Sequence, residues 1–306
     1  MGVKPEPIPA ADMPLRAHLT GPTPALDPRR FIARADFVEV GLADRISAAH
    51  YVAPWRQRAV AAVTPVRATA GPASRAVSAV LYGEVFDVFE IVGDWAFGRS
   101  VHDDYVGWLP LAALGDPVVA PRTARITARV APSFAAADIK APVQAMLPFG
   151  AAVAGEIAGN FLALADGGFV HARHIAPLAR PTPLGVARRF AGAPYVWGGR
   201  TPDGVDCSGL VQAALAACGI AAPRDSDQQR ASVGSAVAFN DRATGDLVFF
   251  PGHVGILAGR DSLFHANAHW MTTLEEPLMD VIARLRAAGA ETPVLGLRRP
   301  ARPISA

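Results

Sequence analysis

The clearest hydrophobic pattern in this sequence covers residues 208–217, a stretch without proline. Its larger apolar side chains recur with the period of an α-helix, at Leu210, Val211, Ala214 and Leu215. Gly219 follows at the position where a helix C-cap glycine belongs. The pattern therefore predicts a short helix that has Cys207 at its N-terminus.

Short apolar runs of strand type follow this helix. Residues 246–257 are typical of two strands joined by a Pro-Gly turn, with His253 at the start of the second strand. Residues 262–266 form a third strand-like run, which contains His265. We expect the three strands to be antiparallel and to bring both histidines under the start of the helix.

An earlier region, residues 56–117, has the pattern of a small β-barrel. A strand begins at Val63, and two strand runs within residues 79–92 are separated at Gly83. Alternation resumes after the turn at residues 93–94, and residues 105–110 close the unit. These features predict a first all-β barrel.

Residues 118–180 repeat this plan more weakly, since residues 168–177 echo residues 105–111. We interpret them as a second, diverged barrel, and the prolines between residues 177 and 183 as the linker to a last domain at residues 181–306. Residues 1–55 begin with a proline-rich stretch. We expect an N-terminal arm, partly helical within residues 27–49, that packs on the later domains.

Composition narrows the function classes. Two cysteines in 306 residues do not form a disulfide scaffold. On one helix Cys207 and Cys218 are about 16 Å apart, too far for a disulfide, which needs alpha carbons within about 7 Å. We therefore interpret Cys218 as structural. A net charge of +2 gives no reason to expect nucleic acid as a partner.

The first twenty residues contain four prolines and no continuous apolar run, which favours neither a secretory leader nor a membrane span. No later apolar run reaches about 18 residues. We therefore expect no membrane partner and a cytoplasmic protein, where a reducing environment suits a free thiol. Whether a leader has been removed stays open.

Cys207 has the position of a catalytic cysteine. Unpaired N–H groups and the dipole at a helix N-terminus favour a thiolate, the nucleophilic form of the side chain. The alternative is a small buried core residue, which is the commoner role of a free cysteine. A nucleophile also needs a base, and His253 is the candidate, with His265 to orient it.

Four segments carry a family resemblance: Asp206-Cys-Ser-Gly-Leu, Gly245-Asp-Leu-Val-Phe-Phe, His253-Val-Gly-Ile and Phe264-His-Ala. In order and content they resemble the NlpC family of papain-like cell-wall cysteine peptidases, over about residues 181–300. The resemblance implies an α+β papain-like domain, with the cysteine-bearing helix packed on an antiparallel sheet. It implies Cys207 as nucleophile, His253 as general base and His265 as the orienting residue. Backbone N–H groups at the helix start would stabilise the oxyanion.

Two barrels before such a domain are similar to the γ-D-glutamyl-L-diamino-acid endopeptidases that recycle cell-wall peptides. In those enzymes the first barrel, which resembles a bacterial Src-homology-3 domain, helps to hold the free L-alanine amine of a murein tripeptide or tetrapeptide. A buried ammonium needs an anion. The resemblance assigns Asp225 to the amine, with Ser226 and Tyr105 beside it. The further substrate-binding candidates are Glu84, Trp197, Asp206 and Ser208.

Several of these residues have structural alternatives. Asp225 and Asp227 follow a proline and are suited to cap a helix that begins near Gln228. Tyr105 has the pattern of an ordinary barrel residue. Histidine pairs occur at positions 265 and 269 and at positions 171 and 174, but no third ligand stands at a recognisable spacing and no HExxH motif occurs. We expect no metal and no cofactor.

Three other functions remain open: an amidase or acyltransferase of the same fold, a binding protein with a silent site, and an exported hydrolase of polymeric peptidoglycan. The sequence does not decide whether the third substrate residue is meso-diaminopimelate or lysine. The oligomeric state and the role of residues 1–55 are also open.

Overall fold

The computed structural model describes residues 25–120 and 122–301, which divide into two units at Ala53. In the first unit, strand β1 (Val38–Glu39) pairs in parallel with β2 (Tyr51–Val52), and the 3-10 turn η2 (Val40–Leu42) follows β1. Within residues 25–53 the helical structure is limited to the 3-10 helix η2, and the predicted partly helical arm stays a prediction. Residues 1–24 of the predicted arm lie outside the described residues.

The second unit begins with an antiparallel sheet of seven strands in the order β5-β4-β8-β7-β6-β3-β9. The strands are β3 (Trp55–Ala59), β4 (Val63–Arg67), β5 (Ala76–Leu81), β6 (Val85–Val92), β7 (Trp95–Ser100), β8 (Val106–Pro110) and β9 (Leu114–Gly115). Gly83 separates β5 from β6 with a φ of +76°, which glycine adopts without steric cost. Apolar side chains fill the interior, among them Val66, Val80, Phe86 and Leu109. We call this sheet the first β unit.

A second β unit follows, with six strands in the order β10-β13-β14-β15-β11-β12. The strands are β10 (Arg122–Arg125), β11 (Val130–Phe134), β12 (Val143–Pro148), β13 (Ala152–Ala158), β14 (Phe161–Leu164) and β15 (Phe169–His171). When the strands are matched in chain order, β10 to β15 have the same neighbours as β3 to β8 of the first β unit. The second β unit thus repeats the topology of the first β unit, around a core that also includes Leu81 of β5.

The last domain is built on an antiparallel sheet in the order β18-β23-β19-β20-β21-β22. Its strands are β18 (Ser235–Val237), β19 (Leu247–Phe250), β20 (His253–Leu257), β21 (Ser262–Asn267), β22 (Thr272–Pro277) and β23 (Gly296–Arg299). The helices are α1 (Pro183–Ala187), α2 (Cys207–Ala216), α3 (Ser226–Ser232) and α4 (Leu278–Ala287). A short hairpin, β16 (Arg200–Thr201) and β17 (Gly204–Val205), precedes α2.

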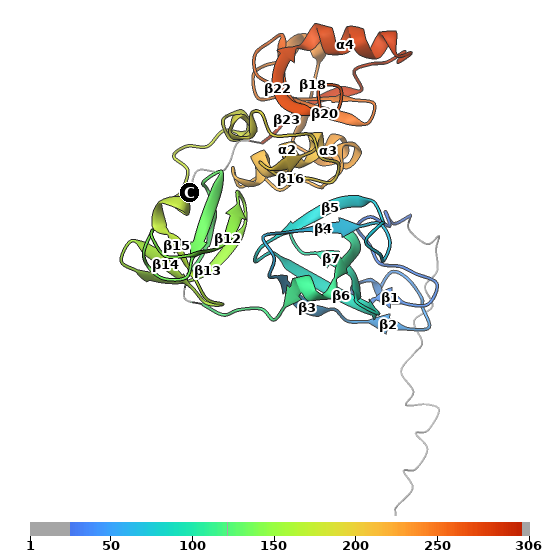
Figure 1. Ribbon diagram of the computed structural model, residues 1–306. Helices are drawn as coiled ribbons and strands as arrows, with labels where there is room; N and C mark the ends of the chain where they lie inside the picture. The colour runs from blue at the N-terminus through green and yellow to red at the C-terminus, as the bar shows by residue number, and fades with distance from the viewer. Residues whose placement is uncertain (1–24, 121, 302–306) are drawn as a thin grey trace, which may run out of the picture. The chain divides into compact units, whose positions relative to one another are not determined.

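Strand alternation explains how this sheet holds helices on both faces. Leu247 and Phe249 of β19 pack with the residues of α1 and α2, whereas Val248 and Phe250 pack with those of α4. Figure 1 shows α2 and α4 on opposite sides of the sheet. The α+β class with a cysteine-bearing helix on an antiparallel sheet, after an all-β region, is confirmed. Among the described residues, no helix is long and apolar enough to cross a membrane.

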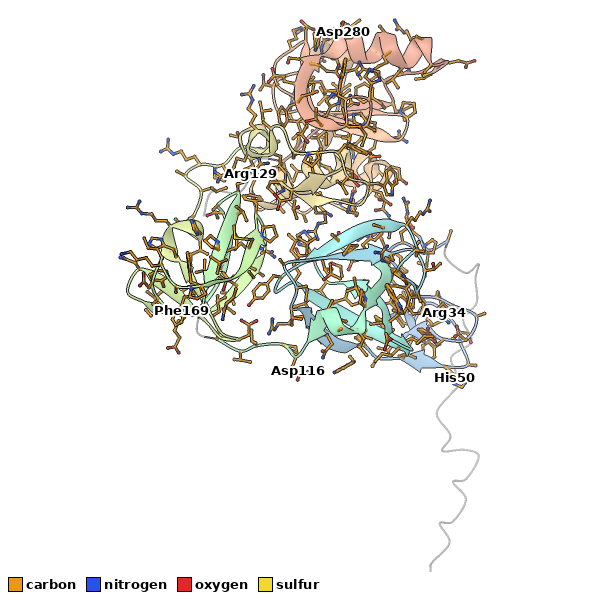
Figure 2. All side chains as sticks on the ribbon, viewed as in Figure 1. Arg34, His50, Asp116, Arg129, Phe169 and Asp280 are labelled. Carbon is orange, nitrogen blue, oxygen red and sulfur yellow. The ribbon has the colours of Figure 1, made fainter. Side chains whose placement is uncertain are left out.

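The second β unit contacts the last domain through arginine side chains and through Phe149, whose buried ring packs on Phe190. Arg129 donates to the backbone oxygens of Arg189, at 2.7 Å, and of Pro202, at 3.0 Å (Figure 2). Arg189 returns a bond to the backbone oxygen of Thr127, at 2.7 Å. The contacts of the first β unit with the last domain lie at the candidate active site.

Candidate active site

Cys207 is the first residue of α2, as the sequence predicts. Asp206 caps the helix, since its Oδ1 accepts the N–H of Gly209 at 2.7 Å. The Cys207 thiol is buried and meets the backbone N–H of Val254, the residue directly after His253. The fold therefore brings the helix start to the beginning of β20, where His253 stands.

The ionisation of the two groups differs from the sequence-based expectation. Burial, and after it the Asp206 carboxylate, raise the pKa of the Cys207 thiol to about 12, although backbone N–H groups act in the opposite direction. Burial and the neighbouring His265 lower the pKa of His253 to about 3. The prediction of a lowered thiol pKa is thus wrong here, because desolvation outweighs the helix N-terminus. Near neutral pH the site holds a neutral thiol and a neutral imidazole.

The two histidines are in direct contact. His253 Nε2 lies 2.8 Å from His265 Nδ1. The other ring nitrogen of His253, Nδ1, takes no part in this contact. His265 is fully buried, and burial lowers its pKa. The structure thus brings the predicted base and the predicted orienting residue together.

Glu276 lies on the far side of His265, with its Oε1 2.8 Å from His265 Nε2. Arg284 of α4 donates to both of its oxygens, at 2.6 and 3.2 Å. Trp270 Nε1 donates at 3.1 Å and Asn267 Nδ2 at 2.9 Å. The imidazole pair therefore ends on a carboxylate that is held by several donors.

The strand register accounts for this contact. Leu263 of β21 pairs with Glu276 of β22, and His265 pairs with Leu274. Opposite residues of an antiparallel pair share a face, so His265 and Glu276 are diagonal neighbours. Leu263 belongs to the core under α4, which places this face toward the helix that supplies Arg284.

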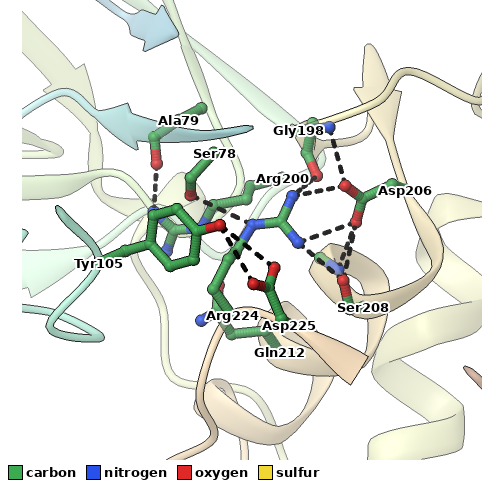
Figure 3. Close-up of polar contacts among 12 residues, drawn as sticks. Ser78, Ala79, Tyr105, Gly198, Arg200, Asp206, Ser208, Gln212, Arg224 and Asp225 are labelled. Atoms are coloured by element: carbon green, nitrogen blue, oxygen red, sulfur yellow. Dashed lines mark hydrogen bonds and ion pairs between the residues drawn. The ribbon is translucent and has the colours of Figure 1, made fainter. Parts of the chain in front are cut away.

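A buried ion pair fixes the start of α2 (Figure 3). Arg224 donates to both oxygens of Asp206, at 3.0 and 2.6 Å, and to Ser208 Oγ, at 2.8 Å. Gly198 N–H donates to Asp206 Oδ2 at 2.8 Å, and Arg224 Nε reaches Ser78 Oγ of β5 at 3.1 Å. The polar groups of Asp206 and Ser208 thus hold the helix, and we no longer assign them to substrate.

Tyr105 and Asp225, 120 positions apart in the sequence, lie side by side (Figure 3). The Tyr105 hydroxyl is 3.1 Å from Asp225 Oδ2 and 3.4 Å from Oδ1. Asp225 occupies the N-cap position of α3 but its side chain makes no capping hydrogen bond. The first β unit therefore places Tyr105 beside the Asp225 carboxylate. Asp225 directly follows Arg224 and so adjoins the buried Arg224–Asp206 pair at the start of α2.

The other candidates from the sequence are placed as follows. Ser226, partly buried, follows Asp225 as the first residue of α3. Trp197 is 60% exposed in the segment before the catalytic helix. Tyr195, in the same segment, lies close to the thiol: burial and then Cys207 raise the pKa of its hydroxyl.

Glu84 has a different role from the one predicted. Its side chain is buried and paired with Arg200, with contacts of 2.9 and 3.2 Å, and Arg200 also donates to the backbone oxygen of Ala79. Glu84 Oε2 accepts the N–H of Leu81 as well. These partners commit the carboxylate to the contact between the first β unit and the last domain, so we withdraw Glu84 as a ligand for the amine.

Sequence reasoning missed Glu276, Arg284, Arg200 and Arg224, and left Gln212 unassigned. Gln212 Nε2 donates to Asp103 Oδ2 of the first β unit, at 3.0 Å. Glu276 on strand β22 gave no recognisable signal, because its register with β21 depends on the loop between the two strands. Within the described parts of the chain, no three His, Cys, Asp or Glu side chains are grouped to hold a metal ion.

Comparisons with known proteins agree with this architecture. Residues 192–282 match the NlpC/P60 family, and residues 66–114 match the bacterial dipeptidyl-peptidase SH3 domain. In fold, the chain is similar to an NlpC/P60 family protein from Bacillus cereus, with a TM-score of 0.66 and 18% identity over 80% of this chain and 99% of that one.

Curated relatives match a part of the chain. The chain is 40% identical over 90 residues to the bifunctional muramidase/DL-endopeptidase CwlT of Bacillus subtilis, covering 26% of this chain and 27% of that protein. It is 39% identical over 121 residues to the gamma-DL-glutamyl hydrolase of the same organism, covering 36% and 29%. It is 36% identical over 81 residues to dipeptidyl-peptidase 6 of Lysinibacillus sphaericus, covering 26% and 30%.

The chain thus spans less than half the length of the curated relatives it matches. The matched residues nevertheless include the cysteine helix, the strand that His253 opens and the strand that carries His265. The protein therefore contains a domain of the NlpC/P60 family, preceded by a bacterial SH3 domain.

Proposed function

We propose that this protein is a cysteine endopeptidase that hydrolyses the γ-D-glutamyl bond to the diamino acid of murein peptides with a free N-terminal L-alanine. The contact between Tyr105 and Asp225 carries the proposal, because it joins the first β unit to a carboxylate next to the catalytic helix. The names of the relatives agree with the class of bond, since they include a DL-endopeptidase and a gamma-DL-glutamyl hydrolase.

The chemistry is acyl transfer by a thiol that is neutral at rest. Cys207 attacks the γ-carbonyl of the D-glutamyl residue while His253 Nδ1 accepts the thiol proton. Backbone N–H groups at the start of α2 stabilise the oxyanion. The imidazolium then protonates the leaving amine, and water activated by His253 hydrolyses the thioester and restores the thiol.

The free amine gives specificity. An ammonium that enters a closed site needs an anionic partner, and a carboxylate offers about four acceptor positions. Asp225 is our candidate for this anionic partner. Ser226, the first residue of α3, and Trp197, exposed in the segment before α2, remain candidate substrate contacts. Acylation of the amine removes the charge that Asp225 attracts.

This specificity suits released wall peptides rather than polymer stems, in which the alanine is acylated. We therefore place the enzyme in peptide recycling, with the cytoplasm as its compartment. The third residue of the peptide is a diamino acid, either meso-diaminopimelate or lysine.

The test is incubation with L-Ala-γ-D-Glu-meso-diaminopimelate and its lysine counterpart, followed by mass spectrometry of the products. We expect release of L-Ala-D-Glu and the free diamino acid, and loss of both products in Cys207→Ala. Cys218→Ala is the matched control, because Cys218 lies in the core at the other end of α2 and its removal leaves cleavage in place. Cleavage by Cys207→Ala at the wild-type rate would remove the thiol from the mechanism, and no cleavage of either peptide by the wild type would contradict the substrate class.

A further inference from the structure

The hydrogen bonds that link His253, His265 and Glu276 can run in two directions, which differ in the ring nitrogen that carries each proton. A neutral imidazole has one N–H and one bare nitrogen, and His253 and His265 share a single hydrogen bond. In one direction the bare nitrogen of His253 is Nδ1, which can take a proton from Cys207. In the other direction Nδ1 is protonated and the ring cannot act as a base. Only the partners of His265 can select between them.

The partners of Glu276 show that its carboxylate is ionised. Arg284 donates two hydrogen bonds to it, and Trp270 and Asn267 one each. The Asn267 amide is oriented independently, since its Oδ1 accepts the N–H of His269 at 2.6 Å and its NH2 group therefore points to Glu276. Burial acts to raise the pKa of Glu276, but the bonds from Arg284 and Trp270 prevail and lower it. An ionised carboxylate accepts hydrogen bonds and donates none.

This requirement fixes every proton in the chain. At 2.8 Å from an acceptor, His265 Nε2 has to carry the N–H. Its Nδ1 is then bare and accepts the N–H of His253 Nε2, at 2.8 Å. His253 Nδ1 is consequently bare. The reverse order would place a bare Nε2 of His265 against the carboxylate, and the Asn267 contact at 3.1 Å does not relieve that repulsion.

We propose that Glu276 is a positioning residue that sets the tautomers of both histidines and so keeps His253 in the form that can accept the thiol proton. Arg284 and Trp270 act with it by holding the carboxylate in its ionised state and orientation. When Cys207 transfers its proton to His253 Nδ1, no other proton has to move. The positive charge that forms on His253 is stabilised by the Glu276 carboxylate through the His265 ring.

The first test needs no variant and no substrate: nitrogen-15 NMR of the histidine rings in the wild-type protein at pH 7. The proposal predicts that His253 and His265 both carry their proton on Nε2. A proton on Nδ1 of either ring would overturn it. Because this result does not depend on what the enzyme cleaves, it stands apart from the proposed function.

The second test is Glu276→Gln, which keeps the shape of the side chain but gives it an amide donor. The donor can face His265 Nε2 and reverse both tautomers. We expect kcat on the murein peptide to fall by about 10²–10⁴-fold, the scale that a wrong tautomer costs in a serine triad, with KM little changed. The matched control is Glu275→Gln, the exposed neighbour that pairs with Arg188 and Ser262 on the other face of β22 and should keep kcat.

A double variant separates tautomer control from a merely structural role. In His265→Asn the amide can present its oxygen to His253 Nε2 whatever residue occupies position 276. The added change Glu276→Gln should therefore cost less than about fivefold in that background. An equal loss in both backgrounds, or a Glu276→Gln enzyme with wild-type kcat, would refute the proposal. The kinetic tests rest on the proposed function. If the peptide is not the substrate, the rate of Cys207 alkylation replaces the kinetic measurements. It should fall in Glu276→Gln and not in the control Glu275→Gln.

Discussion

The two β units share one strand order, yet they contact the last domain by different chemistry. The first unit supplies buried side-chain partners: Ser78 to Arg224, Glu84 to Arg200, Asp103 to Gln212 and Tyr105 to Asp225. The second β unit is joined by exposed arginines that donate to backbone oxygens, and by the buried Phe149 ring, which packs edge-on against Phe190. A repeated fold has therefore been used twice, once as a wall of the candidate site and once as a support.

The difference shows that topology does not determine function here. What distinguishes the first unit is the set of polar side chains on β5, on the turn after it, and on the segment before β8. These side chains meet the residues around α2 and α3. Changes at the two contacts should therefore have unequal effects, with the largest expected at the first β unit.

The largest effect should follow Arg224→Met. This change leaves the buried Asp206 carboxylate without its cationic partner and takes a donor from Ser78. Breaking a buried pair in this way costs about 3–5 kcal/mol. We expect the free energy of unfolding in urea to fall by that amount, with loss of activity.

Arg129→Met is the counterpart in the second unit. The side chain is exposed and its partners are backbone oxygens, so the loss should be below about 1 kcal/mol. Equal losses in the two variants would mean that the two contacts are energetically alike.

Acid should loosen the first contact before the second. Burial acts to raise the pKa of Glu84, but Arg200 and His102 prevail and hold it below its ordinary value of 4.5. Burial, and after it Arg200, lower the pKa of His102 below its ordinary value of 6.5. Both groups bind protons more readily in the unfolded chain. Stability therefore falls as the pH drops below about 6.5 through His102, and again below about 4.5 through Glu84.

Arginine contacts to backbone oxygens do not titrate in this range. Hydrogen exchange, corrected for its intrinsic pH dependence, should therefore show β5 losing protection between pH 7 and pH 4 before residues 127–130 do. Simultaneous loss at both places would contradict the assignment.

Tyr105→Phe should have a smaller effect than Arg224→Met, because it removes one hydrogen bond to Asp225 and leaves the carboxylate in place. We expect kcat/KM for the free-amine peptide to fall about tenfold, since a hydrogen bond to a charged group contributes about 1.5–3 kcal/mol. Tyr82→Phe is the matched control, because that hydroxyl donates to Asp166 of the second unit. Its kcat/KM should stay near the wild-type value.

Much of this fold follows from local sequence signals. The helical period after Cys207, the Pro-Gly turn before His253 and the break at Gly83 each predict an element that the structure contains. Among the candidates for the site, His253 with His265 and Tyr105 with Asp225 lie together as the resemblance implies.

What the sequence could not supply depends on long-range geometry. The burial that raises the Cys207 pKa comes from packing of distant strands, so helix position alone gave the wrong direction. Glu84 was assigned by charge, but its partner Arg200 lies 116 positions away. Glu276 meets His265 only through a strand register that the loop at residues 268–271 sets, where Met271 has a φ of +54°.

The most direct test of the central claim compares cleavage of L-Ala-γ-D-Glu-meso-diaminopimelate with cleavage of the same peptide acetylated on its alanine amine, in the wild type and in Asp225→Asn. We expect the wild type to prefer the free amine by about 100-fold in kcat/KM, or about 2.7 kcal/mol, and Asp225→Asn to lose most of that preference. Glu156→Gln, an exposed carboxylate of the second β unit, should keep it. Equal cleavage of both peptides by the wild type, or a preference that survives in Asp225→Asn, would contradict an amine site built by Asp225 and the first β unit.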